Sequence, residues 1–377
     1  MRIAFIGLRA IGPSVAGGIE KAVEELSTRL VELGHEVTVF TRARYDQHDG
    51  ADFQGVRLRR LPAVYTKHLE AISNTLAAVS HALRGYDIIH INATGPALLA
   101  FLPRLFGRKV VVTVHGLDWK REKWGGFAKI WLRIGAWAAA TFPSRTTVVS
   151  KTLRQHYRDA YGKEVDYIPN GVVLPDLDQL PEARSPLDLR KGEFVLFLSR
   201  LVPEKGCHTL ISAFRQVDTD KKLVIAGPPS HSEEYASSLR LLADGDPRIV
   251  FVGPQFGPQK DALFRDAYAF VLPSTIEGMA LVLLEAMSFG KGCLCSDIPE
   301  NLEVVDASTD GASRWVAARF RTGDVADLRA QLDRLLKQPA LVEQLGRNAR
   351  EHVARSFNWD RIVRQYDRMY RELTAVK

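Results

Sequence analysis

Short apolar runs alternate with amphipathic stretches along most of the chain. The first example is residues 3–7, an apolar run of strand length, followed by residues 19–33, whose apolar positions repeat along one helix face. Further strands are expected at 36–41, 87–91, 109–115, 146–149, 165–168, 194–198, 223–226, 249–252, 269–272 and 292–295, and further helices at 325–336, 339–355 and 360–373. This repeated order predicts an α/β protein built on doubly wound, Rossmann-like parallel sheets.

One stretch interrupts this alternation near the middle of the chain. Residues 174–191 are rich in proline, aspartate and arginine and lack a strand or helix period, so they are predicted to be a linker. The chain has 377 residues, which is enough for two domains. We therefore expect a first domain at 1–173 and a second domain at 192–355.

The composition narrows the class of protein only slightly. A formal net charge of +7 predicts attraction to anions, which can be nucleotide diphosphates, an anionic membrane surface or nucleic acid. Three cysteines cannot form a disulfide framework, which favours a reducing compartment and a cytoplasmic protein. The apolar N-terminus is expected to be a buried strand and no membrane-length apolar run follows it, so secretion and membrane spanning are not supported.

The segment at 274–290 carries the most specific chemical pattern. Glu277 and Glu285 are separated by seven residues, all apolar except Gly278. Glu277 is expected in a loop, and Glu285 in a helix whose first turn begins near Gly278. The free N–H groups of such a helix start favour a phosphate. A carboxylate beside Leu283 needs hydrogen-bond donors, which the hydroxyls of a ligand would supply. A nucleotide-sugar has this combination of groups.

Two cations and two glycines are further candidates. Arg200 and Lys205 follow the expected strand 194–198, where they can neutralise a diphosphate without a metal, although a lone pair of this kind is more often a solvated loop. Gly17 and Gly18 precede the first helix and allow a ligand to approach the backbone, but a plain tight turn has the same pattern. This loop lacks the glycine fingerprint of dinucleotide-binding proteins.

His115 is the candidate at the end of another strand. It follows an apolar run and precedes Gly116, so we expect it to be exposed in a cleft, where it can hydrogen-bond a sugar hydroxyl or orient an acceptor. A core histidine is the alternative interpretation. The Asp-x-Asp patterns at 218–220 and 244–246 are similar to a metal site, but no buried strand runs into either one, so both are predicted to be turns.

Residues 119–137 combine aromatic and basic side chains. Four of the six tryptophans, Trp119, Trp124, Trp131 and Trp137, are interleaved there with five lysines and arginines. The combination suits a membrane interface or a sugar-lipid acceptor, and it also suits single-stranded nucleic acid. The helical spacing of Phe127, Trp131 and Ile134 fits ordinary core packing equally well.

The run 274–290 resembles the E-x7-E signature of the retaining glycosyltransferases of family 4, and the resemblance extends over nearly the whole chain. Residues 197–206 are similar to the diphosphate-binding element of that family, and residues 115–120 to bacterial members that build surface polysaccharide. The resemblance implies the GT-B fold, in which two Rossmann-like domains face a central cleft. It also implies that residues 356–377 return to the first domain as a helix.

The resemblance implies a role for each candidate residue. Glu285 would bind the ribose hydroxyls of the donor, and Glu277 the hydroxyls of the transferred sugar. The backbone of Gly278, Met279 and Ala280 would hold the diphosphate together with Arg200 and Lys205. Gly17, Gly18 and His115 would line the cleft.

The implied reaction is retaining, metal-independent transfer of a hexose-type sugar from a UDP- or GDP-sugar to a saccharide, in the default case lipid-linked, for exopolysaccharide or O-antigen synthesis. The enzyme would be cytoplasmic and peripheral on the inner membrane face, with no metal or cofactor. A GT-B nucleotide-sugar 2-epimerase and a non-catalytic protein that binds membranes or nucleic acid are the alternatives. A pure binder has no need of Glu277, Arg200 and Lys205 in this arrangement, so nucleic acid is not expected as a partner.

Overall fold

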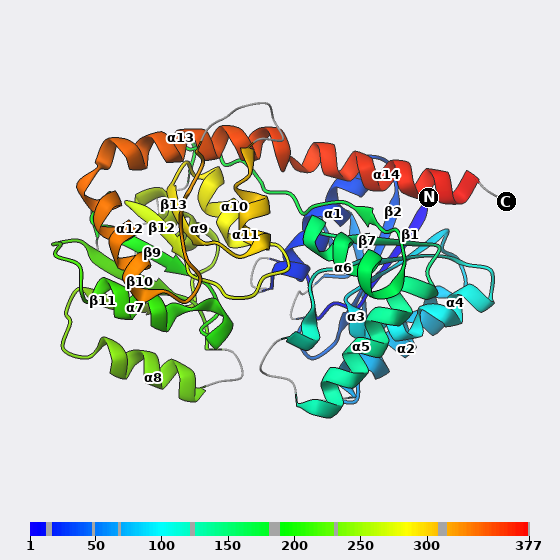
Figure 1. Ribbon diagram of the computed structural model, residues 1–377. Helices are drawn as coiled ribbons and strands as arrows, with labels where there is room; N and C mark the ends of the chain where they lie inside the picture. The colour runs from blue at the N-terminus through cyan, green and yellow to red at the C-terminus, as the bar shows by residue number, and fades with distance from the viewer. Residues whose placement is uncertain are drawn as a thin grey trace. The chain divides into compact units, whose positions relative to one another are not determined.

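The chain forms two α/β units (Figure 1). The computed structural model describes residues 1–12, 17–46, 50–66, 69–120, 125–180, 189–229, 233–307 and 315–375. The first unit comprises Met1–Gly171 and Trp359–Lys377, and the second comprises Val172–Asn358. The linker predicted at 174–191 therefore falls in the second unit, and its residues 181–188 lie outside the described part.

The first unit is built on an eight-stranded sheet with the order β3-β4-β2-β1-β5-β6-β7-β8. Its strands are β1 (Arg2–Ile6), β2 (Glu36–Arg42), β3 (Asp52–Phe53), β4 (Val56–Leu61), β5 (Ile88–Asn92), β6 (Lys109–Val114), β7 (Arg145–Val148) and β8 (Asp166–Tyr167). All neighbouring strands are parallel except β3 and β4, which form an antiparallel hairpin that we did not predict. Three arginines in β4 break its apolar run, which concealed the strand.

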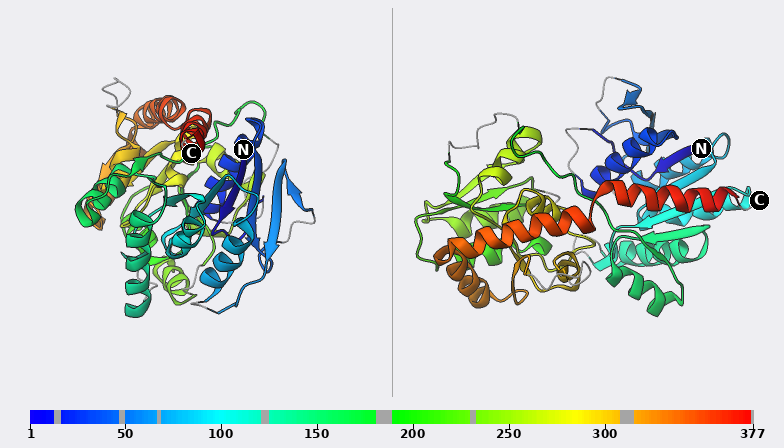
Figure 2. Two further views of the ribbon diagram at one scale, coloured as in Figure 1. Left: turned by 90° about the vertical axis from the view of Figure 1, so that its right-hand side faces the viewer. Right: turned by 90° about the horizontal axis from the view of Figure 1, so that it is seen from above.

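Helices of the first unit connect these strands. They are α1 (Gly18–Glu32), α2 (Glu70–Ala82), α3 (Thr94–Ala97), η1 (Leu98–Ala100), α4 (Phe101–Leu105), η2 (Asp118–Lys120), α5 (Gly126–Thr141), α6 (Lys151–Tyr161) and α14 (Trp359–Ala375). The last of them, α14, runs along this unit in the right-hand view of Figure 2. Its Tyr370 hydroxyl lies 2.6 Å from Nδ1 of buried His90, and Asp367 lies 2.8 Å from Nε2 of His35. These contacts fix the end of the chain to the first sheet.

The second unit is built on a six-stranded parallel sheet with the order β11-β10-β9-β12-β13-β14. Its strands are β9 (Phe194–Leu198), β10 (Lys222–Ala226), β11 (Ile249–Gly253), β12 (Ala269–Leu272), β13 (Gly292–Ser296) and β14 (Ala318–Phe320). Its helices are η3 (Pro203–Lys205), α7 (Cys207–Phe214), α8 (Glu233–Ala243), α9 (Gly257–Asp266), α10 (Leu281–Ser288), α11 (Pro299–Val304), α12 (Val325–Lys337) and α13 (Pro339–Ser356). Two Rossmann-like units with parallel sheets confirm the predicted fold class.

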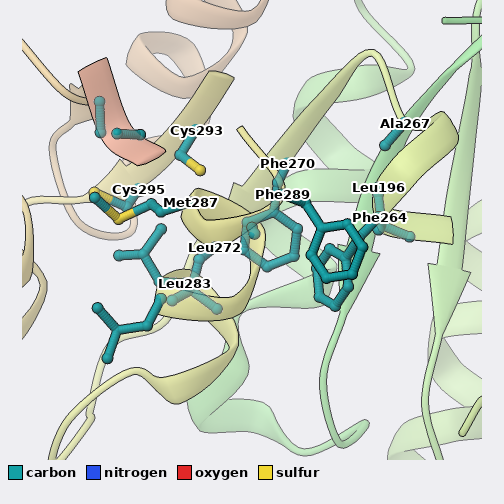
Figure 3. Packing of buried hydrophobic residues seen from close by; sticks show 14 of the residues in the cluster. Leu196, Phe264, Ala267, Phe270, Leu272, Leu283, Met287, Phe289, Cys293 and Cys295 are labelled. Atoms are coloured by element: carbon teal, nitrogen blue, oxygen red, sulfur yellow. The ribbon is translucent and has the colours of Figure 1, made fainter. Parts of the chain in front are cut away.

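Apolar side chains from α9, α10 and the central strands form one core of the second unit (Figure 3). Phe264 of α9 stacks on Phe289 at a ring distance of 5.3 Å, and Leu283 of α10 is completely buried. This packing holds α10 against β12 and β13. The position of Glu285, on the side of α10 away from this core, is therefore determined by the apolar residues around it.

Candidate active site

Two loops leave neighbouring strands of the second unit at the same edge of the sheet. Strands β9 and β12 are parallel and directly paired, so the loop after Leu198 and the loop after Leu272 begin side by side. Arg200 and Lys205 lie in the first loop, and Glu277 lies in the second. The carboxyl edge of a parallel sheet is the usual ligand-binding position of such folds.

Lys205 and Glu277 form an ion pair although 72 residues separate them in the sequence. Lys205 Nζ lies 2.5 Å from Glu277 Oε1, and the two side chains are 12% and 7% exposed. Ser274 Oγ donates a second hydrogen bond, of 2.7 Å, to the same carboxylate oxygen. The structure thus joins two of the predicted site residues and adds a serine that sequence reasoning missed, although Ser274 lies only three residues before Glu277.

The two loops are also held together through their backbones. Thr275 N donates to Glu204 O at 2.9 Å. Gly206 has a φ of +68°, and a Cβ built on it would lie 2.0 Å from the carbonyl oxygen of Pro273. A glycine is required there because the backbones approach more closely than a side chain permits. The Lys205–Glu277 pair is therefore fixed by the geometry of both loops.

Buried polar side chains hold the backbone of Ser274 in place through hydrogen bonds. Ser274, Ser296 and Asn301 are each completely buried. Ser296 Oγ donates to the carbonyl oxygen of Ser274, and Asn301 Nδ2 donates to Ser296 Oγ at 3.0 Å. Buried hydrogen bonds of this kind restrict the rotation of the side chains that form them, so the loop carrying Glu277 has little freedom to move.

The helix after Glu277 begins later than predicted. We expected its first turn near Gly278, but α10 begins at Leu281, and Ala280 is its N-cap residue. Glu285 therefore lies about one turn into the helix rather than two. The apolar residues at 278–280 are compatible with either conformation, which is why the sequence did not locate the start. No side chain caps α10, so its first-turn N–H groups lack a side-chain acceptor.

Glu285 has a cationic partner that the sequence analysis did not identify. Its Oε1 lies 2.9 Å from Nζ of Lys260, in the first turn of α9, and both side chains are 25% exposed. We expected this carboxylate to sit among apolar residues and to depend on ligand hydroxyls for hydrogen bonds. That expectation was wrong in this respect, because Lys260 supplies a donor from the same protein.

The remaining predicted donor-site residues lie on the same loops. Arg200 is half-buried two residues after β9. Gly278 and Ala280 are buried, and Met279 between them is half-buried. Their backbone groups lie between Glu277 and the start of α10, where partial positive charge gathers at a helix N-terminus.

Gly17 and Gly18 lie at the start of α1 in the first unit. Gly17 is the N-cap residue and has an extended backbone, with φ −171°. A Cβ on Gly17 would lie 2.0 Å from Oε2 of Glu20, so the carboxylate of Glu20 covers this residue. Residues 13–16 of the preceding loop lie outside the described part. An anion that reached this helix start would have to displace Glu20.

His115 lies directly after β6 and is half-buried rather than exposed as we expected. Its Nε2 lies 3.2 Å from Oδ1 of Asn92 at the end of the neighbouring strand β5, so the ring N–H donates to the amide oxygen. Burial lowers the pKa of His115 to about 4, with Asp118 opposing the shift. At neutral pH the ring is therefore uncharged, and Nδ1 is its hydrogen-bond acceptor.

The two Asp-x-Asp patterns lie in loops, as predicted. Residues 218–220 precede β10, and residues 244–246 follow α8. Asp246 pairs with Arg248 at 2.8 Å, and the hydrogen bonds from Arg248 lower the pKa of Asp246. Within the described ranges, no cluster of three or more histidine, cysteine or acidic side chains has the geometry to hold a metal.

The aromatic segment after His115 divides between the interior and the surface. Trp119 is buried, with its ring 5.7 Å from that of His156. Trp131 and Trp137 are each more than 40% exposed on α5, so core packing is the wrong interpretation for Trp131. Ile134 is exposed as well. Trp124 lies outside the described residues.

Comparison with known proteins assigns both units to one class of enzyme. The family model described as Glycosyltransferase Family 4 matches residues 16–174, and the model described as Glycosyl transferases group 1 matches residues 181–352. Together they account for most of the chain, and the chain is a glycosyltransferase. The first unit matches the family 4 model, and the second unit matches the group 1 model.

Relatives match over almost the whole length at low identity. The chain is 26% identical to alpha-maltose-1-phosphate synthase of Mycolicibacterium smegmatis, with all of both chains covered. It is 27% identical to D-inositol 3-phosphate glycosyltransferase of Gordonia bronchialis, over 93% of this chain and 83% of the relative.

Solved structures agree on the fold. Sucrose-phosphate synthase of Thermosynechococcus elongatus has a TM-score of 0.80 at 24% identity, with all of both chains covered. HepE of Anabaena, in complex with UDP and glucose, has a TM-score of 0.77 at 19% identity, over 99% of this chain and 100% of the other. The fold is therefore that of the GT-B glycosyltransferases.

Proposed function

We propose that this glycosyltransferase is retaining and metal-independent, and that it moves a hexose-type sugar from a UDP- or GDP-sugar to a saccharide acceptor. The observation that carries the proposal is the Lys205–Glu277 ion pair with Ser274 at the carboxyl edge of the second sheet. The similar proteins include synthases of sugar phosphates, and HepE was solved with UDP and glucose. Both support a nucleotide-sugar donor.

The ion pair suits a site that exchanges partners when the donor binds. In the structure described here, Lys205 and Glu277 neutralise each other. A bound diphosphate would pair with Lys205 in place of Glu277, and Glu277 would then accept hydrogen bonds from the hydroxyls of the sugar. Because the pair is almost buried, neither group could be left without a partner at low cost. Donor binding therefore has to satisfy both groups at once.

Leaving-group stabilisation follows from the same cations. As the glycosidic bond breaks, negative charge accumulates on the departing diphosphate. Arg200, Lys205 and the N–H groups at the start of α10 would stabilise that charge more strongly in the transition state than in the ground state. Two side-chain cations and a helix start supply this charge without a metal. Attack by the acceptor hydroxyl on the face of the leaving group would retain the anomeric configuration, with the leaving phosphate taking the proton.

His115 is suited to hydrogen bonding rather than to acid catalysis. Because the pKa of His115 is lowered to about 4, its ring is neutral at pH 7. Its single N–H, at Nε2, donates a hydrogen bond to Oδ1 of Asn92. We assign to Nδ1 a hydrogen bond from a substrate hydroxyl. The acceptor that we propose is a lipid-linked saccharide in exopolysaccharide or O-antigen assembly, by analogy with the resemblance of residues 115–120.

Calorimetry with nucleotide diphosphates tests the donor site directly. UDP, GDP, ADP and dTDP would be titrated into the full chain in the presence of EDTA. We expect micromolar binding of UDP or GDP that is lost in Arg200→Ala and retained in Arg347→Ala, a matched change at an exposed arginine of the same unit. No binding of any diphosphate would contradict the donor site.

Turnover separates the transferase from its alternatives. The diphosphate that binds identifies the donor, which is then incubated with and without oligosaccharide acceptors, and with and without EDTA. We expect an α-linked product from an α-linked donor, at an unchanged rate with EDTA. A changed sugar nucleotide formed without any acceptor would indicate an epimerase and would overturn the proposal.

A further inference from the structure

The outer face of α5 is apolar, where a surface helix ordinarily presents polar side chains to water. Ile130, Trp131, Ile134 and Trp137 are 58%, 43%, 43% and 47% exposed. The inner face is made of small residues, and a Cβ on Gly135 would lie 2.3 Å from the carbonyl oxygen of Thr94. This close packing fixes α5 against α3, so its large apolar residues cannot turn inward.

The apolar surface continues onto the neighbouring helix. Leu105 and Phe106, at the end of α4, are 75% and 64% exposed. Phe142 connects the two helices, because its ring lies 5.7 Å from that of Phe101 and 5.3 Å from that of Trp137. We define the α4–α5 surface as Leu105, Phe106, Ile130, Trp131, Ile134 and Trp137. Contiguous exposed apolar side chains of this kind mark interaction sites.

The charges around the α4–α5 surface are almost all positive. Residues 94–120 and 125–141, the described part of this region, contain six lysines and arginines and one acidic residue, Asp118. Three of these cations, Arg104, Lys120 and Arg133, have exposed side chains. Apolar and aromatic residues bordered by cations match a bilayer with anionic headgroups, since the rings insert at the interface while the cations meet the phosphates.

Two open pockets, one beside the middle of α5 and one at its C-terminal end, repeat this combination at close range. One, of about 510 Å³, is lined by Trp119, Ile134, Trp137, His156 and Tyr161 together with Arg133. The other, of about 590 Å³, is lined by Leu98, Phe101, Leu105, Thr141 and Phe142 together with Arg104. Each pocket places one guanidinium beside apolar walls. That arrangement suits a headgroup phosphate and the glycerol and upper acyl segment attached to it.

We propose that the α4–α5 surface docks the chain on an anionic lipid bilayer. A second copy of the chain would bring the same positive charge against this face, which opposes pairing of two copies. Nucleic acid would use the rings and cations but would leave Leu105, Ile130 and Ile134 without an apolar partner. The proposal extends the proposed function and rests on it only for the lipid-linked acceptor, which such a membrane would carry.

Vesicle co-sedimentation of the full chain tests the docking. Vesicles of phosphatidylcholine alone would be compared with vesicles that also contain phosphatidylglycerol, across a series of salt concentrations. We expect binding to the anionic vesicles, weakened by salt, and a blue shift of tryptophan emission on binding. A chain that stays in the supernatant with both kinds of vesicle would overturn the proposal.

Matched variants locate the contact. Trp131→Ser with Trp137→Ser should lower the partition coefficient about tenfold or more, because two exposed rings leave the bilayer. Trp315→Ser is the control, since Trp315 is 69% exposed on the second unit. Arg104→Gln with Arg133→Gln should reduce the salt dependence, and Arg347→Gln should not. Equal losses in the control variants would overturn the assignment to α4 and α5.

Two further measurements separate the alternatives. Light scattering without lipid should show a monomer. A dimer that Trp131→Ser dissociates would instead make the α4–α5 surface an interface between two copies and would overturn the proposal. Calorimetry with the diphosphate should give the same affinity for wild type and for the α4–α5 variants. If the wild type binds no diphosphate, the proposed function is wrong, whereas binding to anionic vesicles would still support the docking surface.

Discussion

The two units have the same kind of parallel sheet, but the groups at the carboxyl ends of their central strands differ in charge. In the second unit, charged side chains meet at the carboxyl edge of the sheet, as the ion pairs Lys205–Glu277 and Lys260–Glu285. In the first unit, the carboxyl ends of the central strands β5 and β6 carry the neutral contact between His115 and Asn92. An ion pair does occur at this edge, between Arg42 at the end of β2 and Glu70, but it lies two strands away from β5. The central strand ends therefore carry an ion pair in the second unit and a neutral hydrogen bond in the first.

Burial explains the neutral interior of the first unit. His90 contacts Thr113 and Tyr370 at 2.6 Å each, and burial lowers its pKa to about 3. His115 behaves in the same way. A charged ring in either position would lack a counterion close enough to offset the loss of solvation. Two similar folds can therefore present chemically different surfaces when their strand-end residues differ.

The sharpest test of this difference removes the carboxylate of the second unit. Glu277→Ala should lower the rate of transfer roughly a thousandfold, because it removes the group that we propose binds the sugar and leaves Lys205 without its partner. Initial rates with saturating donor measure the effect. Glu343→Ala, at an exposed position of the same unit, is the control. Near-wild-type turnover of the first variant would contradict the site.

A second test concerns the close approach of the two loops that carry Lys205 and Glu277. Gly206→Ala should lower the free energy of unfolding by roughly 3 kcal/mol, since the new Cβ meets the Pro273 carbonyl oxygen at 2.0 Å in a left-handed backbone. Gly245→Ala isolates the backbone effect, because Gly245 has φ +79° and no atom near its Cβ. It should cost only about 1 kcal/mol. Equal losses in urea unfolding would show that the close approach contributes nothing.

Acid should destabilise the first unit through its neutral histidines. The pKa of His115 is lower in the folded chain, so the unfolded chain binds more protons between pH 6.5 and pH 4, and stability falls as pH falls through that range. At pH 5 the loss is up to about 2 kcal/mol for this histidine, and as much again for His90.

Tryptophan emission reports on this unit, because five of the six tryptophans belong to it. Urea unfolding of wild type at pH 7 and pH 5 measures the loss. His115→Asn should reduce the pH dependence, whereas His81→Asn, at an exposed position, should leave it unchanged. The same pH dependence in all three proteins would show that these buried rings are not the cause.

The smallest expected effect concerns the partner of Glu285. Lys260→Met should weaken binding of the nucleotide diphosphate by about threefold to tenfold, because the half-exposed carboxylate loses the group that orients it. Calorimetry measures the change, with Lys337→Met as the control on an exposed helical pair. Tighter binding in the first variant would mean that Lys260 competes with the ligand for Glu285.

Local pattern was sufficient for most of the sheet strands, because most central strands are largely apolar. The bounds of β9 and β12 agree with the prediction at both ends. The hairpin β3–β4 was missed because three exposed arginines interrupt β4, which buries only Val56, Leu58 and Leu61. Apolar periodicity detects strands buried on both faces more readily than half-exposed ones.

The candidate site was predictable only where its residues belong to a recognisable local pattern. Glu277 and Glu285 stand out through their spacing, whereas Ser274 and Lys260 have no local signal that distinguishes them from ordinary loop and helix residues. Lys260 meets Glu285 only because α9 and α10 lie against the same core. Trp131 and Ile134 show the same limit, since helical spacing groups side chains on one face without telling which side of the helix faces water.

The contact of α14 with the first sheet also constrains the order in which the chain can fold during synthesis. Residues 172–358 form a continuous unit, which can fold as soon as they have left the ribosome. The first unit is made earlier, yet His90 must wait for the hydroxyl of Tyr370, at the far end of the chain, to complete its hydrogen bonds. The domain that is synthesised first is therefore the one that is completed last.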